Sequence, residues 1–371
     1  VTVVCDPEDY ARIISEIEAG GNTTVETRLQ LSAKAYTHTA EYDMCIATYM
    51  RKQAELNEKL FASFDLVQTL RYGENPHQSA KFYASQERVP YSLATAKQLN
   101  GKEMSYNNIQ DANAALNIVR EFKEPFAVGL KHMNPCGAAI GKDIREAWEK
   151  AYEADKVSIF GGIVAVNREL TKEVAELMKP IFLEIIMAPS FSEEALEVLC
   201  TKKNLRLLQV DMTKDDSVVN QYVSVNGGLL VQDLDKSTTE VKAEMCVTEL
   251  KPTDEQLTDL NFGWRIVKHV KSNAIVAVKD GHTVGVGAGQ MNRVGSAEIA
   301  LKQAHAAGFK EGLVLASDGF FPFDDSVTMA AEYGVMAIVQ PGGSVRDEDS
   351  IAKANEKGIT MLFTGMRHFK H

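Results

Sequence analysis

From about residue 66 onward, short β-branched and apolar runs alternate with stretches of helical periodicity. The sequence predicts strands at 126–130, 157–160, 184–188, 274–278, 283–286, 313–316 and 335–339, and helices at 144–154, 170–179, 297–307 and 325–333. The turn Lys279-Asp280-Gly281 between two of these strands favours a hairpin. Strands that alternate with helices are typical of an α/β domain in which helices cover a sheet.

The two halves of this region share an order of elements, which indicates an internal repeat. Each half has a strand with a glycine, a helix, a strand that ends in a glycine loop, a second helix and a strand that ends in proline. Any α/β domain shows some alternation, so a single unrepeated domain remains the alternative. We favour two similar α/β/α units, 66–250 and 251–371, with the charged segment Lys251–Phe262 joining them.

Residues 1–65 are predicted to be helical and to contain no strand. A first helix around 10–17 ends at Gly20-Gly21, and the segments 22–35 and 39–56 predict two more helices. Amphipathic helices without a sheet to cover are expected to be the closing part of a domain whose core lies upstream. The first residue is valine and not methionine, which suggests that the chain does not begin where its gene begins.

Composition excludes several classes of protein. A chain of 371 residues, 45% of them hydrophobic, can form two domains with cores of their own. The net charge of −11 disfavours a phosphate backbone, so we expect no nucleic-acid partner. No apolar run approaches the roughly 20 residues that cross a bilayer, and no secretory signal is recognisable, so we expect no membrane partner. The five cysteines never have C-x-x-C spacing, which argues against disulfides and structural zinc and favours the cytoplasm.

A lysine–histidine pair directly follows the expected strand 126–130, in the segment KHMNPCG (131–137). The neighbouring cation favours the neutral form of His132, which is the form that accepts a proton. Residues 134–137 predict a tight turn that fixes the loop. Because α/β folds present ligand-binding loops at strand ends, this segment is a candidate catalytic site. A surface basic pair followed by a turn is the alternative.

Three further segments are candidates for ligand binding. RYGENPHQ (71–78) suits an anionic ligand, with Arg71 binding a phosphate, and a structural arginine in a turn is the alternative. GVGAGQMNR (285–293) lacks the third glycine and the acid of a dinucleotide fingerprint, so we expect its small residues to bring main-chain amides close to a ligand, beside Arg293. SDGFFPF (317–323) is either an aromatic plug between domains or an apolar slot for a fused ring such as a pterin.

Eight segments, in this order along the chain, resemble one family, the bifunctional AICAR transformylase/IMP cyclohydrolases of purine synthesis. They are RYGENPHQ (71–78), YNNIQDAN (106–113), KHMNPCG (131–137), IFGG (159–162), KSNAI (271–275), GVGAGQMNR (285–293), SDGFFPF (317–323) and RHFKH (367–371). The opening residues VTVVCDPEDY and the helices after them are similar to the closing part of the family's cyclohydrolase domain.

The resemblance implies formyl transfer from 10-formyltetrahydrofolate to the 5-amino group of AICAR, giving FAICAR and tetrahydrofolate. Because most of the cyclohydrolase domain has no counterpart here, we expect no cyclohydrolase activity. The resemblance also implies two cytidine-deaminase-like α/β/α subdomains after the helical remnant, and a homodimer with active sites at its interface. It implies no catalytic zinc and leaves room for a monovalent cation such as potassium.

The resemblance also assigns roles to single residues. His132 would take a proton from the amino group as it attacks the formyl carbon. Lys131 would keep His132 neutral and stabilise the oxyanion or the departing folate nitrogen, and Asn273 would donate to the oxyanion. The substrate-binding positions are Arg71, Tyr72, Asn108, Phe160, Gly161, Glu184, Arg293, Phe320 and Arg367, and the folate-binding positions are Phe321, Pro322, Phe323, Asp325 and Gln290. At Glu184 the family commonly has aspartate.

Two other functions remain alternatives. A zinc-dependent base deaminase would share the fold, but it needs an H-x-E motif and a P-C-x-x-C motif, and this chain has only Pro135-Cys136. A non-catalytic nucleotide-binding or dimerisation module would bind AICAR without turning it over.

Overall fold

The computed structural model describes residues 1–85, 89–213, 220–237 and 239–371. These residues form two compact units. Unit 1 is Val1–Leu66 with the segment that begins at Tyr83, and unit 2 is the remainder. Among the described residues, no helix combines the length and the apolar character needed to cross a membrane.

Unit 1 is built from two helices, α1 (Tyr10–Gly20) and α2 (Val25–Gln53), which follow the 3-10 helix η1 (Pro7–Asp9). The left-handed Gly21 ends α1, as the glycine pair predicts. The prediction of two separate helices between 22 and 56 is wrong, because α2 is continuous. No glycine or proline interrupts α2, and the hydroxyls of Thr37 and Thr39 donate to carbonyl oxygens of the preceding turn.

Unit 2 contains an 11-stranded mixed sheet in the order β15-β14-β13-β11-β12-β5-β4-β6-β7-β8-β3. Its strands are β3 (Lys97–Asn100), β4 (Phe126–Lys131), β5 (Asn134–Ile140), β6 (Gly162–Val166), β7 (Leu183–Ala188), β8 (Arg206–Gln209), β11 (Ile275–Lys279), β12 (His282–Gly287), β13 (Leu313–Ser317), β14 (Val335–Gln340) and β15 (Thr360–Phe363). Its helices are α3 (Tyr106–Val119), α4 (Ile144–Ala154), α5 (Lys172–Met178), α6 (Glu193–Leu199), α7 (Asp254–Val267), α8 (Arg293–Ala306), α9 (Asp325–Glu332) and α10 (Asp347–Lys357).

The sheet contains the same unit twice. The order α3-β4-β5-α4-β6-α5-β7-α6-β8 recurs as α7-β11-β12-α8-β13-α9-β14-α10-β15. In each half the first two strands form an antiparallel hairpin. The third strand pairs antiparallel with the first strand, and the fourth and fifth strands extend the sheet from the third strand in parallel. The halves join where β5 and β12 run antiparallel. The two halves therefore share their order of elements and their strand directions, whereas the description as two subdomains divided at residue 250 stays a prediction.

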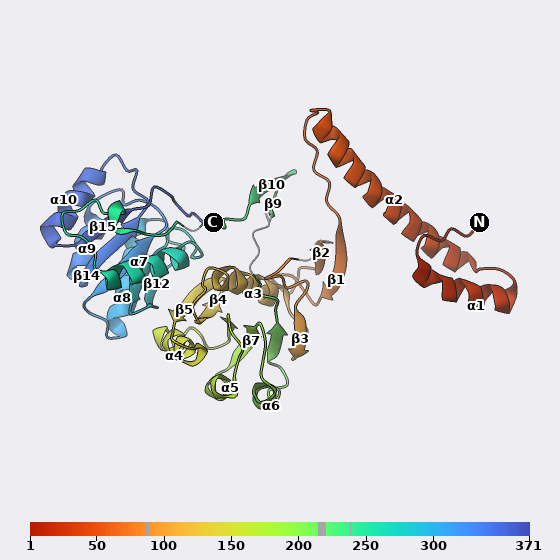
Figure 1. The fold of residues 1–371 in the computed structure, drawn as a ribbon, viewed down its shortest axis with the longest axis horizontal. Coiled ribbons are helices and arrows are strands. Elements are labelled where there is room, and N and C mark those ends of the chain that lie inside the picture. Colours follow the sequence, from red (N-terminus) through yellow and green to blue (C-terminus); the bar gives the residue numbers. More distant parts are fainter. Residues whose placement is uncertain (86–88, 214–219, 238) are drawn as a thin grey trace. The chain divides into compact units, whose positions relative to one another are not determined.

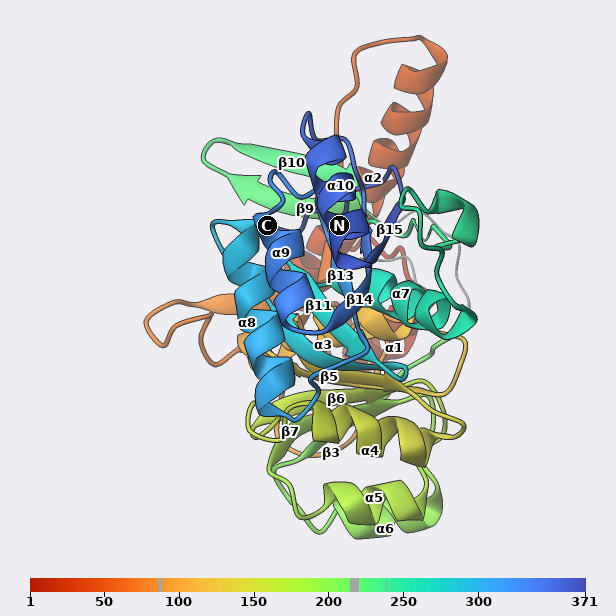
Figure 2. The same cartoon turned by 90° about the vertical axis from the view of Figure 1, so that its left-hand side faces the viewer.

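Helices cover both faces of the sheet (Figure 1). α3 and α7 share one hydrophobic core, α4, α5 and α6 pack on the other face of the first half, and α8, α9 and α10 do so in the second half. Figure 2 shows α7 and α8 on opposite sides of the strands β11 and β13. Because successive strand residues point to opposite faces, Ala127 belongs to one core and Val128 to the other. The fold class is α/β, as predicted.

Three local predictions are wrong. Residues 157–160 form turns and not a strand, because Asp155 Oδ1 accepts the N–H groups of Val157 and Ser158. The expected linker Lys251–Phe262 contains most of α7, whose apolar face is buried in the core. The expected turn at 134–137 is the beginning of β5.

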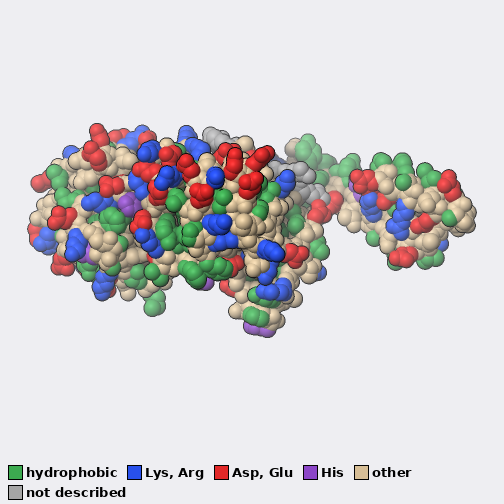
Figure 3. All heavy atoms as spheres, turned by 90° about the horizontal axis from the view of Figure 1, so that it is seen from below, with side chains coloured by type: hydrophobic (Ala, Val, Ile, Leu, Met, Phe, Trp, Pro, Cys, Tyr) green, Lys and Arg blue, Asp and Glu red, His purple; other side chains and the backbone are tan. Residues whose placement is uncertain are grey.

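Two small two-stranded sheets complete the described chain. β1 (Phe64–Leu70) pairs with β2 (Ala80–Ser85), and β9 (Asn220–Val225) pairs with β10 (Gly228–Asp233). The short 3-10 helix η2 (Ala243–Met245) follows. All residues of β9 and β10 are exposed, including Val223, Leu230 and Val231. On the face drawn in Figure 3, acidic and basic side chains are interspersed.

Candidate active site

Strand directions bring loops of both halves to one edge of the sheet. β4 is antiparallel to β5 and β6, so the β4–β5 turn lies at the same edge as the loop before β6. β12 is antiparallel to β5, and β11 is antiparallel to β12 and β13. The loops before β11, after β12 and after β13 therefore reach this same edge. Five of the eight recognised segments, KHMNPCG, IFGG, KSNAI, GVGAGQMNR and SDGFFPF, meet there.

His132 and Met133 form the two-residue turn between β4 and β5. Their φ values of 51° and 61° lie in the left-handed region. Type I′ hairpin turns require this region at both positions and favour asparagine and glycine there. Met133 N–H donates to Asp111 Oδ1 on α3 at 2.8 Å, and Asn134 Nδ2 donates to the His132 carbonyl oxygen at 3.0 Å. The exposed His132 is thus carried by a turn whose main chain is held from two sides.

Lys131 is in contact with the loop that precedes β6. Its Nζ donates to the Phe160 carbonyl oxygen at 2.8 Å. A Cβ atom at Gly161, where φ is 68°, would lie 3.0 Å from this Nζ. Gly161 N–H in turn donates to the Phe182 carbonyl oxygen at 2.7 Å. The structure therefore brings together Lys131, Phe160 and Gly161, and glycine at 161 permits the close approach.

In the second half, Asn273 and Arg293 interact directly. Arg293 Nη2 donates to Asn273 Oδ1 at 2.8 Å, and its Nη1 lies 2.5 Å from Asp318 Oδ1. Asn273 Nδ2 donates to the Gln290 carbonyl oxygen at 2.9 Å. Arg293 is only 6% exposed, so its guanidinium acts within the protein here. Asn273 Nδ2 carries a second N–H, which can donate to a further acceptor.

One asparagine connects the two groups of candidates. Lys271 N–H, two residues before Asn273, donates to Asn134 Oδ1 at 3.0 Å. The same Asn134 amide donates through Nδ2 to the His132 carbonyl oxygen. Because a main-chain N–H can only donate and a carbonyl can only accept, both contacts require the same orientation of the amide. The histidine turn and the KSNAI segment are therefore joined by one side chain.

Glu184, near the beginning of β7, is held by an arginine. Arg206 Nη1 lies 2.8 Å from Glu184 Oε2, and Arg206 Nε and Nη2 donate to the Glu103 carbonyl oxygen at 3.1 Å and 3.0 Å. The Glu184 side chain remains 36% exposed. The longer glutamate side chain is thus fixed in place by Arg206 while part of the side chain remains open to solvent.

Two other substrate-binding candidates have local partners. Arg71 Nη2 donates to Tyr72 Oη at 3.0 Å, and the guanidinium lies 4.7 Å from the tyrosine ring centre. Asn108 forms a capping box with Ser105 at the start of α3, with bonds of 3.1 Å and 3.2 Å. Among the described residues, neither Arg71 nor Asn108 has a hydrogen bond to Lys131.

The aromatic segment after β13 divides into exposed and buried rings. Phe320 and Phe323 are exposed, whereas Phe321 is fully buried in the core of the second half. Pro322 is half-buried, and Asp325 is the first residue of α9. In this structure Phe320 and Phe323 offer ring faces to a ligand, and the Phe321 ring does not.

The C-terminal tail lies beside the residues that precede β11. Ser272 N–H donates to the Lys370 carbonyl oxygen at 2.8 Å, and Lys370 N–H donates to Ser272 Oγ at 3.0 Å. Lys370 Nζ donates to the His269 carbonyl oxygen at 2.9 Å, and burial lowers the pKa of Lys370 to about 8. The exposed Arg367 guanidinium lies 4.9 Å from the ring centre of Phe369. The tail is therefore anchored, and Arg367 remains available to a ligand.

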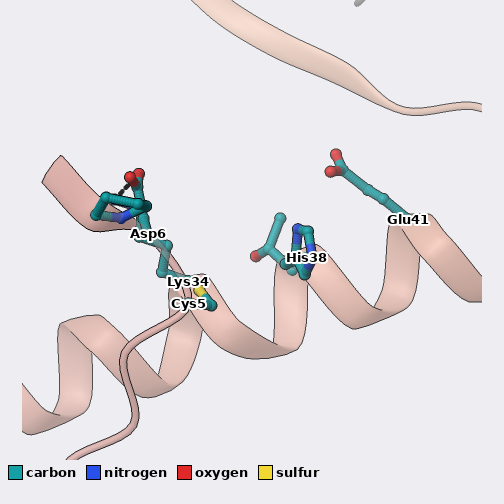
Figure 4. Close-up of a pocket in the computed structure, with 7 residues that line it drawn as sticks. Cys5, Asp6, Lys34, His38 and Glu41 are labelled. Atoms are coloured by element: carbon teal, nitrogen blue, oxygen red, sulfur yellow. Dashed lines mark ion pairs between the residues drawn. The ribbon is translucent and has the colours of Figure 1, made fainter. Parts of the chain in front are cut away.

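Two pockets of the described surface lie away from these side chains. One, of about 370 Å³ in unit 1, is lined by Cys5, Asp6, Pro7, Lys34, Thr37, His38 and Glu41 (Figure 4). There the hydrogen bond to Asp6 raises the pKa of Lys34. The other, of about 590 Å³, surrounds Asp280 and Gly281 at the opposite edge of the sheet of unit 2. Neither of these two pockets is therefore part of the candidate site.

Sequence reasoning missed three residues of this site: Asp111, Asn134 and Arg206. All three act through main-chain groups or other side chains, and no motif assigns them a role. Alignment of the two repeats could have found Asp111, because Asp259 occupies the corresponding position of α7.

Comparison with known proteins gives consistent matches. A model of the family described as AICARFT/IMPCHase bienzyme matches residues 1–303. The bifunctional purine biosynthesis protein PurH of Anoxybacillus flavithermus is 57% identical over 373 residues, which cover 100% of this chain and 73% of that protein. The proteins of the same name from Bacillus cytotoxicus and Bacillus mycoides are 56% and 55% identical, with the same coverage.

The fold and the site define a duplicated α/β protein with a polar site at one edge of its central sheet. The matches go further than this class. The chain belongs to the AICARFT/IMPCHase bienzyme family.

Proposed function

We propose that this chain transfers the formyl group of 10-formyltetrahydrofolate to the 5-amino group of AICAR, giving FAICAR and tetrahydrofolate in purine biosynthesis. The observation that carries the proposal is the family match over residues 1–303, together with 57% identity to a purine biosynthesis protein. The proposal concerns formyl transfer and does not include the ring-closing reaction.

His132 is the general base of the proposed reaction. The 5-amino group is a weak nucleophile because its lone pair is delocalised into the ring, so loss of its proton must accompany attack. A bond forms between this nitrogen and the formyl carbon while the proton passes to His132. The bond from the formyl carbon to folate N10 then breaks, and N10 takes up a proton. Positioned general-base catalysis contributes about 10²- to 10⁴-fold to the rate.

Lys131 and Asn273 stabilise the charge that develops on the formyl oxygen. The Lys131 ammonium is held at the site edge by the Phe160 carbonyl oxygen. Asn273 is held through its Oδ1 by Arg293, which leaves one Nδ2 N–H for the oxyanion. Donors fixed before the reaction stabilise such charge more effectively than mobile ones. This geometry supports Arg293 as a residue that positions Asn273, in addition to its proposed place beside the ribose and carboxamide.

The proposed binding site for AICAR uses positive and polar groups around this centre. Arg71 and Arg367 bind the phosphate, with Tyr72 beside them, and both guanidinium groups are exposed. The ribose and carboxamide lie against Glu184, whose partly exposed side chain can accept from a hydroxyl. The remaining proposed contacts are Asn108, Phe160, Gly161 and Phe320.

The proposed folate site is the aromatic segment after β13. The exposed ring of Phe323 supports stacking against the pterin, next to the proposed AICAR contact Phe320. Phe321 supports the loop from below, because its ring is in the core and its N–H donates to Gln340 Oε1 at 2.9 Å. Pro322, Asp325 and Gln290 complete the proposed contacts with the folate.

Quaternary structure, location and cation belong to the same proposal. The exposed apolar side chains of β9 and β10 support a homodimer, in which a second chain would close the open site. Cysteines that are all unpaired support a cytoplasmic location. Among the described residues, no group of three His, Cys, Asp or Glu side chains could hold a metal ion. A monovalent cation such as potassium would therefore need carbonyl and hydroxyl oxygens as ligands.

The test is formyl transfer from 10-formyltetrahydrofolate to AICAR, followed by the absorbance of tetrahydrofolate, in the parent and in His132→Ala. We expect activity in the parent and a loss of at least about 100-fold in the variant. Unchanged activity in His132→Ala would exclude this histidine as the base. A folded parent that binds AICAR and transfers nothing would favour the non-catalytic binding module.

A further inference from the structure

The internal repeat provides a comparison for the turn that carries His132. Asp111 and Asp259 each lie five residues after the first residue of their helix, α3 or α7. Asp111 Oδ1 accepts the N–H of Met133 at 2.8 Å. Asp259 accepts the N–H groups of Asp280 and Gly281 at 2.9 Å and 2.7 Å. In both halves, a helix aspartate therefore holds the turn of the hairpin that follows.

The two turns differ in how well their residues suit the conformation. Asp280 and Gly281 have φ values of 51° and 71°, and Asp-Gly is a favoured pair for this turn. His132 and Met133 adopt φ values of 51° and 61°, and the left-handed region is tolerated by histidine but unfavourable for the long apolar side chain of Met133. A left-handed turn built from such residues persists only when its surroundings hold it. The His-Met pair therefore depends on its anchors more than the Asp-Gly pair does.

A second residue, Asn134, holds the His132 turn and also contacts the second half of the sheet. Asn134 Nδ2 donates to the His132 carbonyl oxygen at 3.0 Å, and Asn134 Oδ1 accepts from Lys271 N–H at 3.0 Å. Lys271 is two residues from Asn273. The side-chain amide of Asn134 thus links the His132 turn to the segment that carries Asn273.

We propose that Asp111 and Asn134 are positioning residues, which hold His132 in reach of the reaction centre formed with Asn273. The inference rests on the proposed formyl transfer. Neither residue touches the reacting atoms. Asp111 fixes the left-handed turn from the side of α3, and Asn134 fixes its distance from the second half.

The repeat supplies a matched control for Asp111. We expect Asp111→Ala to lower kcat by about 10- to 100-fold and to change the KM for AICAR by less than about twofold, because small displacements of a catalytic group have effects of this size. Asp111→Asn keeps an oxygen that accepts from Met133 N–H and should recover most of kcat. Asp259→Ala removes the equivalent anchor and should lower the melting temperature without changing kcat. Equal losses of kcat in Asp111→Ala and Asp259→Ala would overturn the inference.

Asn134 is tested through its dependence on His132. Asn134→Ala should lower kcat about 10-fold or more in the parent and should cause no further loss in His132→Ala, because the two residues act as one unit. Asn355→Ala is the control. The Asn355 side chain on α10 also holds the main chain, because its Oδ1 accepts from Glu249 N–H at 2.9 Å. Asn355→Ala should leave kcat unchanged. The same fold-loss from Asn134→Ala in both backgrounds would contradict a role through His132.

A readout that does not need activity separates this inference from the proposed function. Amide hydrogen exchange at Met133 should accelerate at least about 10-fold in Asp111→Ala, and exchange at Lys271 should do so in Asn134→Ala. Unchanged exchange at both amides would refute the anchoring, whatever the activity. If the parent transfers no formyl group but exchange responds as expected, the proposed function fails and the anchoring stands.

Discussion

Replacement of Glu121 by glutamine should destabilise unit 2 strongly, because Glu121 belongs to a buried ionic cluster. Its carboxylate follows α3 and lies 2.8 Å from Lys268 Nζ and 3.1 Å from His269 Nε2. The side chains of Glu121 and Lys268 are 5% and 2% exposed. Glutamine preserves the shape of the side chain but removes the carboxylate that pairs with the buried Lys268 ammonium. Removal of one partner of a buried pair costs about 3–5 kcal/mol.

The lowered pKa of Glu121 provides a second way to calculate this loss of stability. Burial alone would raise this pKa, but the hydrogen bond from His269 and the charge of Lys268 lower it from 4.5 to about 2. At roughly 1.36 kcal/mol for each pH unit, this lowering corresponds to about 3 kcal/mol of stability. Because the folded-state pKa is the lower one, this stability is complete above pH 4.5 and is lost as the pH falls through 2. Glutamine does not titrate, so the difference between parent and variant should shrink below pH 4.5.

The measurement is the free energy of unfolding by guanidinium chloride, followed by tryptophan fluorescence at several pH values. Glu149→Gln is the control, because Glu149 pairs with Arg145 at 3.1 Å on the exposed surface of α4 and should cost less than about 1 kcal/mol. A loss below about 1 kcal/mol for Glu121→Gln at neutral pH would refute the reasoning. So would a difference from the parent that is the same at neutral pH and at about pH 3.

Three further predictions concern packing and cysteine chemistry. Gly137→Ala would place a Cβ atom 2.0 Å from a main-chain carbonyl oxygen of α4 and should cost about 2 kcal/mol or more in chemical unfolding, whereas Gly20→Ala meets no atom within 4 Å and should cost nothing. Burial raises the pKa of Cys136 to about 12, so peptide mapping should find it unmodified by iodoacetamide at pH 8 while exposed cysteines react. Phe321→Ala should cost about 3–5 kcal/mol in unfolding, while Phe320→Ala should change stability little and weaken AICAR binding, measured by calorimetry.

Within unit 2 the sequence predicts the strands β4, β7, β11, β12, β13 and β14 and the helices α4, α5, α8 and α9, because their signals are local. The strand β4 and the helix α4 have the expected bounds to within one residue, since a compact apolar run and an Asp143 cap define them. The continuity of α2 and the burial of α7 were missed. The continuity of α2 depends on the absence of a strong helix break, and the burial of α7 depends on tertiary packing. The periodicity of the sequence reveals neither.

The candidate site could be predicted as a set of segments but not as an arrangement. Resemblance to the family marked Lys131, His132 and Asn273, yet nothing in the sequence states that one asparagine joins their loops. The adjacent rings of Phe320 and Phe321 look equivalent in sequence, and only the direction of each side chain separates a core residue from an exposed one. Asp111 lay within a recognised segment, and its role becomes visible through Asp259 in the repeat.

The antiparallel junction between β5 and β12 explains why the two halves contribute different loops to the site. Equivalent loops of the repeat emerge at opposite edges of the sheet, because the halves meet through strands of opposite direction. Asp318, after β13, accepts from Ala274 N–H at 3.1 Å at the site edge. Its counterpart Asn167, after β6, accepts from Phe126 N–H at 2.8 Å at the other edge. At the site edge this position is Asp318, which forms an ion pair with Arg293, and at the other edge it is the neutral amide of Asn167. The duplication therefore repeats the support of the main chain, while the charge at the two edges differs.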